Sequence, residues 1–355
     1  MDPRHASTQI INFDFVGSCR GSCPSCTLSP EERVSEDPFL TGEQMVSALR
    51  EVLKVGHEPS FLAMGVGRAN VLALDPSSHQ RVFELAAVAK ELAPSAHRVM
   101  EISTSLIEAP AKQRANALAI MRGVELVDPG AECRLVVVLD ISQTSQGYWG
   151  AIERFMNEMS EWRGGGDGSG DILVLNLGIG ALPPVDEVLR RVRRWSGPVN
   201  VQWLASGEKA VISDRLLDGL AAWLKQFWEG AIKEELDCNL VNVAEVAVQS
   251  SDDLPVAALA NQLSRLAWVT RDGFVHQGAF TMLGDYAAAA SIDPKTVATR
   301  MFRHAACRGC EQLRSCIRCG GFAPALEVLR RGGASSGVCP SGLIRVLEQV
   351  SAQKR

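Results

Sequence analysis

Strand-like and helix-like segments alternate along the first two-thirds of this 355-residue chain. The clearest strand, Cys133 to Ile141, is a continuous apolar run ending in a carboxylate, as is typical of a buried strand in a parallel sheet. A helical pattern from about Gln146 to Trp162 follows it. Because strands that alternate with helices form parallel sheets covered by those helices, the pattern predicts an α/β architecture of six strand–helix units.

The remaining predicted elements are shorter apolar runs bounded by Gly, Pro or polar residues. The strands are Ile10–Phe15, Phe61–Met64, Val99–Thr104, Asp171–Leu177 and Val199–Leu204. The helices run from about Asp75 to Leu92, after Pro183-Pro184, and from about Asp214 to Leu236. Thr41 and Gln44 have the spacing of a capping box, which predicts another helix that begins there.

Composition restricts the environment and the partners of the chain. Its net charge of −5 gives no general attraction to nucleic acid or to an acidic membrane. No apolar stretch approaches membrane-spanning length, and the N-terminus does not read as a signal peptide. Ten cysteines without an export signal indicate the reducing cytoplasm, where clustered thiols bind metal more often than they form disulfides.

Three of these cysteines follow the first predicted strand directly. Cys19, Cys23 and Cys26 have the spacing C-x3-C-x2-C in a loop that also contains Gly17 and Gly21. Thiolates hold iron–sulfur clusters, normally four to a [4Fe–4S] cube, so three thiolates leave one iron open to a small molecule. A zinc site is the alternative, but zinc sites usually add a second cysteine pair or histidines downstream, and no His or Cys occurs between Cys26 and His57.

The loop CRGSCPSC resembles the cluster loop of the radical S-adenosylmethionine (SAM) superfamily. The resemblance implies a partial (β/α)6 barrel in which the open iron of a [4Fe–4S] cluster binds SAM. Reductive cleavage of SAM then gives a 5′-deoxyadenosyl radical, which abstracts hydrogen from a substrate. The resemblance also implies an external electron donor of the flavodoxin or ferredoxin type.

A second group of cysteines lies near the C-terminus. Cys307, Cys310, Cys316, Cys319 and Cys339 give the pattern C-x2-C-x5-C-x2-C-x19-C. A predicted β-hairpin precedes them, with a turn centred on Asp272-Gly273, followed by Leu283-Gly284-Asp285 and a helix from Pro294 to His304. Taken alone, this segment fits a zinc knuckle and an iron–sulfur site about equally well.

The order of hairpin, Leu-Gly-Asp, helix and cysteine knuckle resembles the SPASM or twitch extension of radical SAM enzymes. The resemblance implies a second, auxiliary [4Fe–4S] cluster held by Cys307, Cys310, Cys316 and Cys339. An inner cluster is expected to be lost, because no cysteine lies between Cys238 and Cys307. Cys319 is then left without a cluster to serve, and the isolated Cys133 and Cys238 are expected to be core residues.

Several residues at predicted strand ends match the SAM-binding positions of the superfamily. Gly65, Gly67 and Arg68 take the place of its Gly-Gly-Glu-Pro stretch, so an arginine replaces the usual acid and is expected to hold a carboxylate. Further candidates at strand ends are Ser103, Asp140 and Asn176, each of which also suits a helix cap or a turn. Ser25 stands where the family often has an aromatic residue. No catalytic base is assigned.

The resemblance divides the chain into four parts. Residues 1–240 are expected to form the barrel, 241–266 a linker or bridging helix, 267–345 the auxiliary-cluster domain, and 346–355 a tail. We expect a maturase that oxidises or cross-links a peptide, with recognition by a separate protein, because the first strand begins too early for an N-terminal recognition domain. The alternatives are a radical SAM dehydrogenase of a sugar or aminocyclitol, and a degenerate iron–sulfur protein that senses redox state.

Overall fold

The computed structural model describes about two-thirds of the chain. The described residues are 8–15, 40–54, 58–68, 71–73, 76–105, 110–141, 146–162, 170–177, 182–195, 197–203, 212–241, 266–269, 273–277, 299, 301–318, 325, 328, 334–335 and 337–353.

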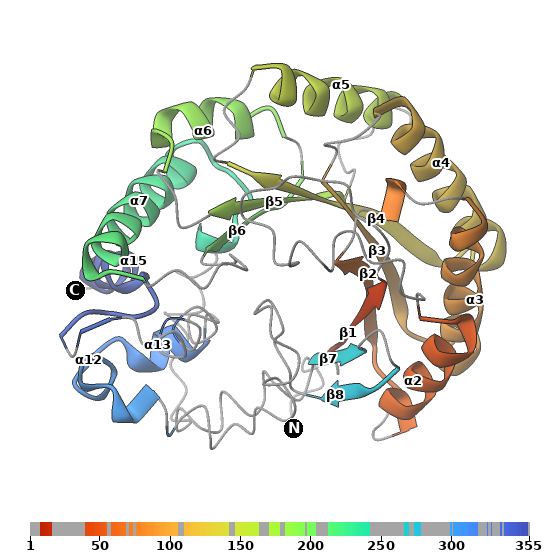
Figure 1. Ribbon diagram of the computed structural model, residues 1–355, viewed down its shortest axis with the longest axis horizontal. Coiled ribbons are helices and arrows are strands. Elements are labelled where there is room, and N and C mark those ends of the chain that lie inside the picture. The colour runs from red at the N-terminus through yellow and green to blue at the C-terminus, as the bar shows by residue number, and fades with distance from the viewer. Residues whose placement is uncertain are drawn as a thin grey trace.

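One eight-stranded sheet organises the molecule, with the strand order β6-β5-β4-β3-β2-β1-β7-β8. Its first six strands run parallel to one another. They are β1 (Thr8–Phe15), β2 (Phe61–Arg68), β3 (His97–Thr104), β4 (Ala131–Asp140), β5 (Ile172–Leu177) and β6 (Val199–Trp203). Figure 1 shows this sheet curled, with the helices along its outer side. The predicted α/β fold with a partial (β/α)6 barrel is therefore confirmed.

Helices alternate with the strands. They are α2 (Gly42–Lys54), α3 (Pro76–Leu92), α4 (Pro110–Val127), α5 (Gln146–Trp162), α6 (Val185–Val192) and α7 (Asp214–Lys233). All of them but α4 were predicted. The predicted capping box is present at the start of α2: the backbone N–H of Gln44 donates to Thr41 Oγ1 at 3.1 Å, and that of Thr41 donates to Gln44 Oε1 at 2.8 Å. None of the helices among the described residues is long and apolar enough to cross a membrane.

The two faces of the curled sheet differ in chemistry. Side chains alternate along a strand, and one set, including Ile11, Phe13, Met64 and Ile102, is buried in the core that the helices share. The other set points to the concave face of the sheet. This set is polar or small at many positions: Asn12, Asp14, Gly65, Gly67, Glu101, Ser103, Asp140, Asn176, Asn200 and Gln202. The concave face is therefore suited to a polar ligand.

A buried ion pair fixes the amino-terminal end of β3. Arg98 Nε donates to Asp128 Oδ2 at 2.6 Å and Nη2 donates to Asp128 Oδ1 at 3.0 Å. Arg98 Nη1 donates to the carbonyl oxygens of Ala93, Pro94 and Ala96. One arginine thus connects β3 with the segments that follow α3 and α4.

The predicted hairpin extends the same sheet. Its strands β7 (Leu266–Val269) and β8 (Val275–Gln277) are antiparallel, and β7 lies parallel to β1, with Ile10 opposite Leu266. Gly273 has a φ of +85°, a conformation that glycine adopts without strain. The hairpin therefore covers the edge of the sheet beyond β1.

The C-terminal segment lies at the α7 side of the barrel. It contains the short helices α12 (Ala305–Arg308) and α13 (Leu313–Arg318) and the longer α15 (Ile344–Ala352), which packs beside α7. Arg345 of α15 forms an ion pair with Asp218 of α7, and the backbone N–H of Ser335 donates to Asp214 Oδ1 at 2.8 Å. Most of the predicted tail, 346–355, belongs to helix α15.

Candidate functional site

Two regions hold the candidate residues, and the first is the carboxyl edge of the parallel sheet. Asp140 pairs in register with Asn176, which pairs with Gln202. The three polar side chains thus form one row across β4, β5 and β6. Asp140 is only 2% exposed, and Oδ1 of Asn176 is buried without a hydrogen-bond partner. A buried polar atom without a partner is costly, so Asn176 is suited to receive a donor from a ligand.

The glycines of β2 leave room for polar neighbours on the concave face. A Cβ atom at Gly67 would lie 2.6 Å from Ser103 Oγ, and one at Gly65 would overlap Oδ1 of Asn12. The sequence suggested that these glycines admit a ligand. The structure shows that side chains from β1 and β3 occupy the space directly beside them.

The cysteines of the N-terminal motif lie outside the described residues, as does Ser25. The loop that carries Cys19, Cys23 and Cys26 begins where β1 ends, at the carboxyl edge of the sheet. There Phe15 pairs in register with Arg68, the last residue of β2. The backbone of Arg68 therefore lies beside the start of the cysteine loop, and its side chain is outside the described part of the structure.

Sequence reasoning missed several polar residues on the concave face. Glu101 and Arg134 are opposite each other in the register of β3 and β4. Burial raises the pKa of Glu101, and this effect outweighs the positive charge of Arg134. Arg134 itself forms a two-pronged ion pair with Glu132, with both N–O distances at 2.7 Å. The period-2 alternation of polar and apolar residues was the available signal.

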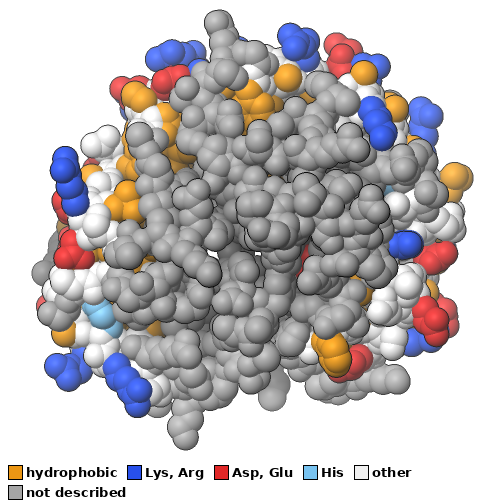
Figure 2. All heavy atoms as spheres, viewed as in Figure 1, with side chains coloured by type: hydrophobic (Ala, Val, Ile, Leu, Met, Phe, Trp, Pro, Cys, Tyr) orange, Lys and Arg blue, Asp and Glu red, His pale blue; other side chains and the backbone are white. Residues whose placement is uncertain are grey.

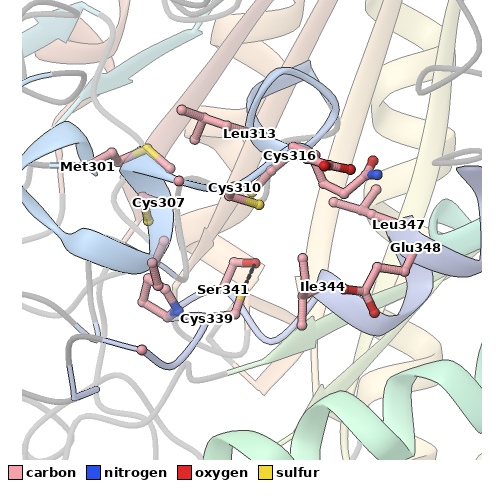
Figure 3. A pocket seen from close by; sticks show the side chains of 17 residues that line it. Met301, Cys307, Cys310, Leu313, Cys316, Cys339, Ser341, Ile344, Leu347 and Glu348 are labelled. Atoms are coloured by element: carbon pink, nitrogen blue, oxygen red, sulfur yellow. Dashed lines mark hydrogen bonds between the residues drawn. The ribbon is translucent and has the colours of Figure 1, made fainter.

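The second region is a cavity of about 450 Å³ in the C-terminal segment. The four cysteines expected to hold an auxiliary cluster, Cys307, Cys310, Cys316 and Cys339, all line it. Two come from α12 and α13, one from the connection between those helices, and one from the segment before α15. Figure 3 shows Cys307, Cys310 and Cys339 around the same space. The structure therefore brings together residues that are 32 positions apart.

The arrangement of the thiols bears on the kind of group they can hold. Sulfur ligands of one tetrahedral zinc ion lie about 3.8 Å apart, given Zn–S bonds of about 2.3 Å. Within the described part of the chain, no three His, Cys, Asp or Glu side chains are gathered closely enough for one metal ion. Four thiols that line one pocket are a donor set that suits an iron–sulfur cluster.

Two of the four thiols, those of Cys307 and Cys310, have a raised pKa. Burial, with the nearby Cys339 and Cys310, raises the pKa of Cys307 to about 12, and burial likewise raises the pKa of Cys310. Metal ligation requires thiolates, so a cation that binds here has to displace protons. The surroundings of Cys307 and Cys310 thus disfavour free thiolates at these two positions.

Ser341 contacts one of the four cysteines directly. Its Oγ lies 3.4 Å from Cys339 Sγ and accepts a hydrogen bond from the backbone N–H of Leu343 at 3.1 Å. Ser341 is 2% exposed. A thiolate carries no proton, so toward a deprotonated Cys339 the hydroxyl would be the donor in this contact.

The other sequence-derived positions divide into two groups. Cys238 is fully buried, as expected of a core residue, and burial raises its pKa to about 11. Cys133 is partly exposed on β4. Cys319 and the sequence Leu283-Gly284-Asp285 lie outside the described residues, and so does most of the linker 241–266.

The fold has counterparts among solved structures. A structure of anSMEcpe with bound AdoMet has a TM-score of 0.61 at 10% sequence identity, covering 98% of this chain and 98% of that chain. A second anSMEcpe structure, with bound AdoMet and the Cp18Cys peptide, has a TM-score of 0.58 at 9% identity, covering 97% and 96%. At these identities the likeness shows a shared fold. No protein-family model matches the sequence, and no curated protein matches it.

Proposed function

We propose that this chain, which shares its fold with the radical SAM sulfatase-maturating enzyme anSMEcpe, is a radical SAM enzyme that modifies a peptide. When bound, a [4Fe–4S] cluster and AdoMet would supply the chemistry, which is reductive cleavage of AdoMet and abstraction of hydrogen from the substrate. The shared curled sheet is the observation that carries the proposal, and the sequence C-x3-C-x2-C directly after β1 agrees with it.

The residues around the first cluster have separate tasks. Cys19, Cys23 and Cys26 ligate three of its irons. Arg68 pairs with the AdoMet carboxylate through its planar fork, and Ser103, Asp140 and Asn176 supply polar contacts at the strand ends. Gly65 and Gly67 have no side chains, and this leaves room on the concave face for the side chains of Asn12 and Ser103. The buried Oδ1 of Asn176 supports this assignment, because a bound ligand would satisfy it.

The cavity in the C-terminal segment supports an auxiliary cluster. Its ligands are Cys307, Cys310, Cys316 and Cys339, which line that cavity. Ser341 holds Cys339 in place. Such a cluster supplies a one-electron site apart from the barrel. Cys319 has no ligand role in this proposal.

A peptide is the substrate class that we favour, and its oxidation or cross-linking the reaction. One anSMEcpe structure holds the Cp18Cys peptide together with AdoMet. The concave face of this chain carries amide and carboxyl side chains on β1, β4, β5 and β6. These groups match the hydrogen-bonding groups of a peptide backbone.

The test replaces the three cysteines of the first cluster. Full-length protein, reconstituted with iron and sulfide without oxygen and then reduced, should convert AdoMet to 5′-deoxyadenosine. The variant Cys19→Ala/Cys23→Ala/Cys26→Ala should lose this product completely and about half of its iron, because no other thiolate is available in that loop. Chromatography of the nucleoside and iron analysis give the two readings.

A cysteine outside both proposed sites provides the control. Cys133→Ala should keep both the iron content and the 5′-deoxyadenosine yield. Deoxyadenosine produced by the triple variant would remove the assignment of the first cluster. A wild-type protein that binds iron at the C-terminal cavity but never cleaves AdoMet would instead favour the non-catalytic alternative.

A further inference from the structure

One carboxyl group on the concave face, that of Glu101, has no role in the proposed function. It lies near the middle of β3, and the row that it belongs to across β1 to β4 consists of Asn12, Gly65, Glu101 and Arg134. Thr104 ends β3 three residues later, so at about 3.3 Å per residue Glu101 lies about 10 Å inside the carboxyl edge of the sheet. It therefore faces the interior of the half-barrel and not its rim.

The cation next to Glu101 is already neutralised by another carboxylate. Arg134 donates to both carboxylate oxygens of Glu132, with N–O distances of 2.7 Å. Glu132 also adds a second negative charge near Glu101. Within the part of the chain that the structure describes, no group donates a hydrogen bond to the Glu101 carboxyl group, which therefore keeps its acceptor capacity for a ligand.

Glu101 also differs in its surroundings from most charged groups of the chain. Figure 2 shows charged side chains mainly around the rim of the molecule, where water can solvate them. Glu101 is partly buried on the inner side of the sheet, and this burial raises its pKa. Burial disfavours the carboxylate form, whereas a cation bound beside the group favours it. A positively charged ligand would thus relieve the cost of this position.

The concave face as a whole carries more negative than positive charge. Asp14 and Asp140 add two further carboxyl groups to it. Among the described residues of this face, the basic side chains are those of Arg134 and His97, and both contact Glu132. The described part of the face therefore attracts cations more strongly than anions.

We infer that Glu101 is a specificity-determining residue that pairs with the cationic side chain of a lysine or arginine in the substrate peptide. This inference rests on the proposed function, in which the concave face binds a peptide. Lysine and arginine carry their charge at the end of a long apolar stem, which suits a carboxyl group that lies inside the edge of the sheet. The amide of Asn12 lies over Gly65, one strand away, and offers a second polar group to the same cation.

Two synthetic peptides that differ in a single charge test this role. The probes are acetyl-Gly-Gly-Lys-Gly-Gly-amide and the same peptide with norleucine, which lacks the ammonium group, in place of lysine. Full-length protein is reconstituted with iron and sulfide and supplied with AdoMet but no reductant, and saturation-transfer NMR gives the two dissociation constants. The lysine peptide should bind at least about tenfold more tightly, because hydrogen bonds between charged groups are the strong ones.

A substitution that keeps the shape of the side chain locates the effect. Glu101→Gln removes the charge and should reduce the preference for lysine to within about twofold, with no change in the affinity for the norleucine peptide. Arg134 keeps its pair with Glu132 in this variant. The matched control, Glu125→Gln, makes the same change at an exposed position of α4 and should keep the full preference.

The outcomes separate this role from the proposed function. Wild-type protein that forms 5′-deoxyadenosine when reduced, but binds both peptides equally, overturns the role of Glu101 alone. Wild-type protein that never forms 5′-deoxyadenosine overturns the proposed function instead. A lysine preference that persists in Glu101→Gln, or falls equally in Glu125→Gln, also overturns the role. If Glu101→Gln does not fold, Glu101→Asp moves the charge back by one carbon and should weaken the preference, and an unchanged preference there again overturns the role.

Discussion

A single hydroxyl group is expected to set the redox behaviour of the auxiliary cluster. Hydrogen bonds to the sulfur ligands of a cluster stabilise its more negative, reduced form. Ser341 is placed to donate one to Cys339 at 3.4 Å. Ser341→Ala should therefore favour the oxidised form and shift the midpoint potential to a more negative value. Each tenfold change in the ratio of the two forms corresponds to about 59 mV for one electron.

An EPR-monitored redox titration in the Cys19→Ala/Cys23→Ala/Cys26→Ala background gives this potential. Ser341→Thr keeps the hydroxyl and should restore the wild-type value. Ser351→Ala is the control, because Ser351 Oγ donates a hydrogen bond to Gln312 Oε1 at 2.9 Å and not to a cysteine. A potential that is unchanged in Ser341→Ala would show that the contact has no electronic role.

At the scale of the elements, the ion pair between Arg98 and Asp128 should dominate local stability. Both side chains are almost fully buried, so Arg98→Met would leave a buried carboxylate without its partner. Breaking such a pair costs about 3–5 kcal/mol in the free energy of unfolding. The exposed pair of Arg114 and Glu158 provides a contrast, and Arg114→Met should cost less than about 1 kcal/mol. Chemical denaturation measures both.

The same pair predicts a dependence on pH. Burial by itself raises the pKa of Asp128, but the hydrogen bonds and charge of Arg98 outweigh it and lower the pKa below its ordinary value of 3.8. The stability that this group contributes is therefore present above pH 3.8 and is lost as the pH falls through the lowered pKa. Asp128→Asn should flatten this acid limb of the stability profile. An unaltered limb would mean that other carboxyl groups determine it.

Local patterns in the sequence predicted most of the elements. The apolar runs gave strands that match β1 to β6 within a few residues, and Thr41 with Gln44 gave the start of α2. Helix α4 was missed, because its apolar positions form only a weak stripe and Gly123 interrupts it. The hairpin strands were predicted, but their pairing with β1 was not, since pairing depends on contacts between residues about 250 positions apart.

The site residues could be predicted only where the signal lies in neighbouring residues of the sequence. Asp140 and Asn176 stood out because each ends a predicted strand. Gln202 and Asn12 did not, because their importance depends on register and on which face of the sheet is concave. The convergence of Cys339 with Cys307 on one cavity came from family resemblance, since no pattern in the intervening residues encodes it.

For the molecule as a whole, the auxiliary cluster is expected to hold the C-terminal segment together. Helix α15 packs against α7 through buried apolar residues such as Val346 and Leu347, whereas α12 and α13 are short helices that carry proposed cluster ligands. Removing iron with a chelator should therefore increase hydrogen exchange in α12 and α13, because metal binding is coupled to folding. Exchange in β3 and β4 should stay unchanged. Equal exchange in α12 with and without iron would contradict a structural role for the cluster.

The pairing of β7 with β1 also has a consequence for synthesis in the cell. Strand β1 leaves the ribosome well before its outer partner β7, which follows about 250 residues later. At about 5–20 residues per second, translation of that interval takes on the order of 10 to 50 s. During this time the nascent chain exposes the unpaired hydrogen-bonding edge of β1, which can pair with other chains. A chain that terminates before Leu266 keeps that edge open permanently, so truncated products should aggregate where the full-length protein does not.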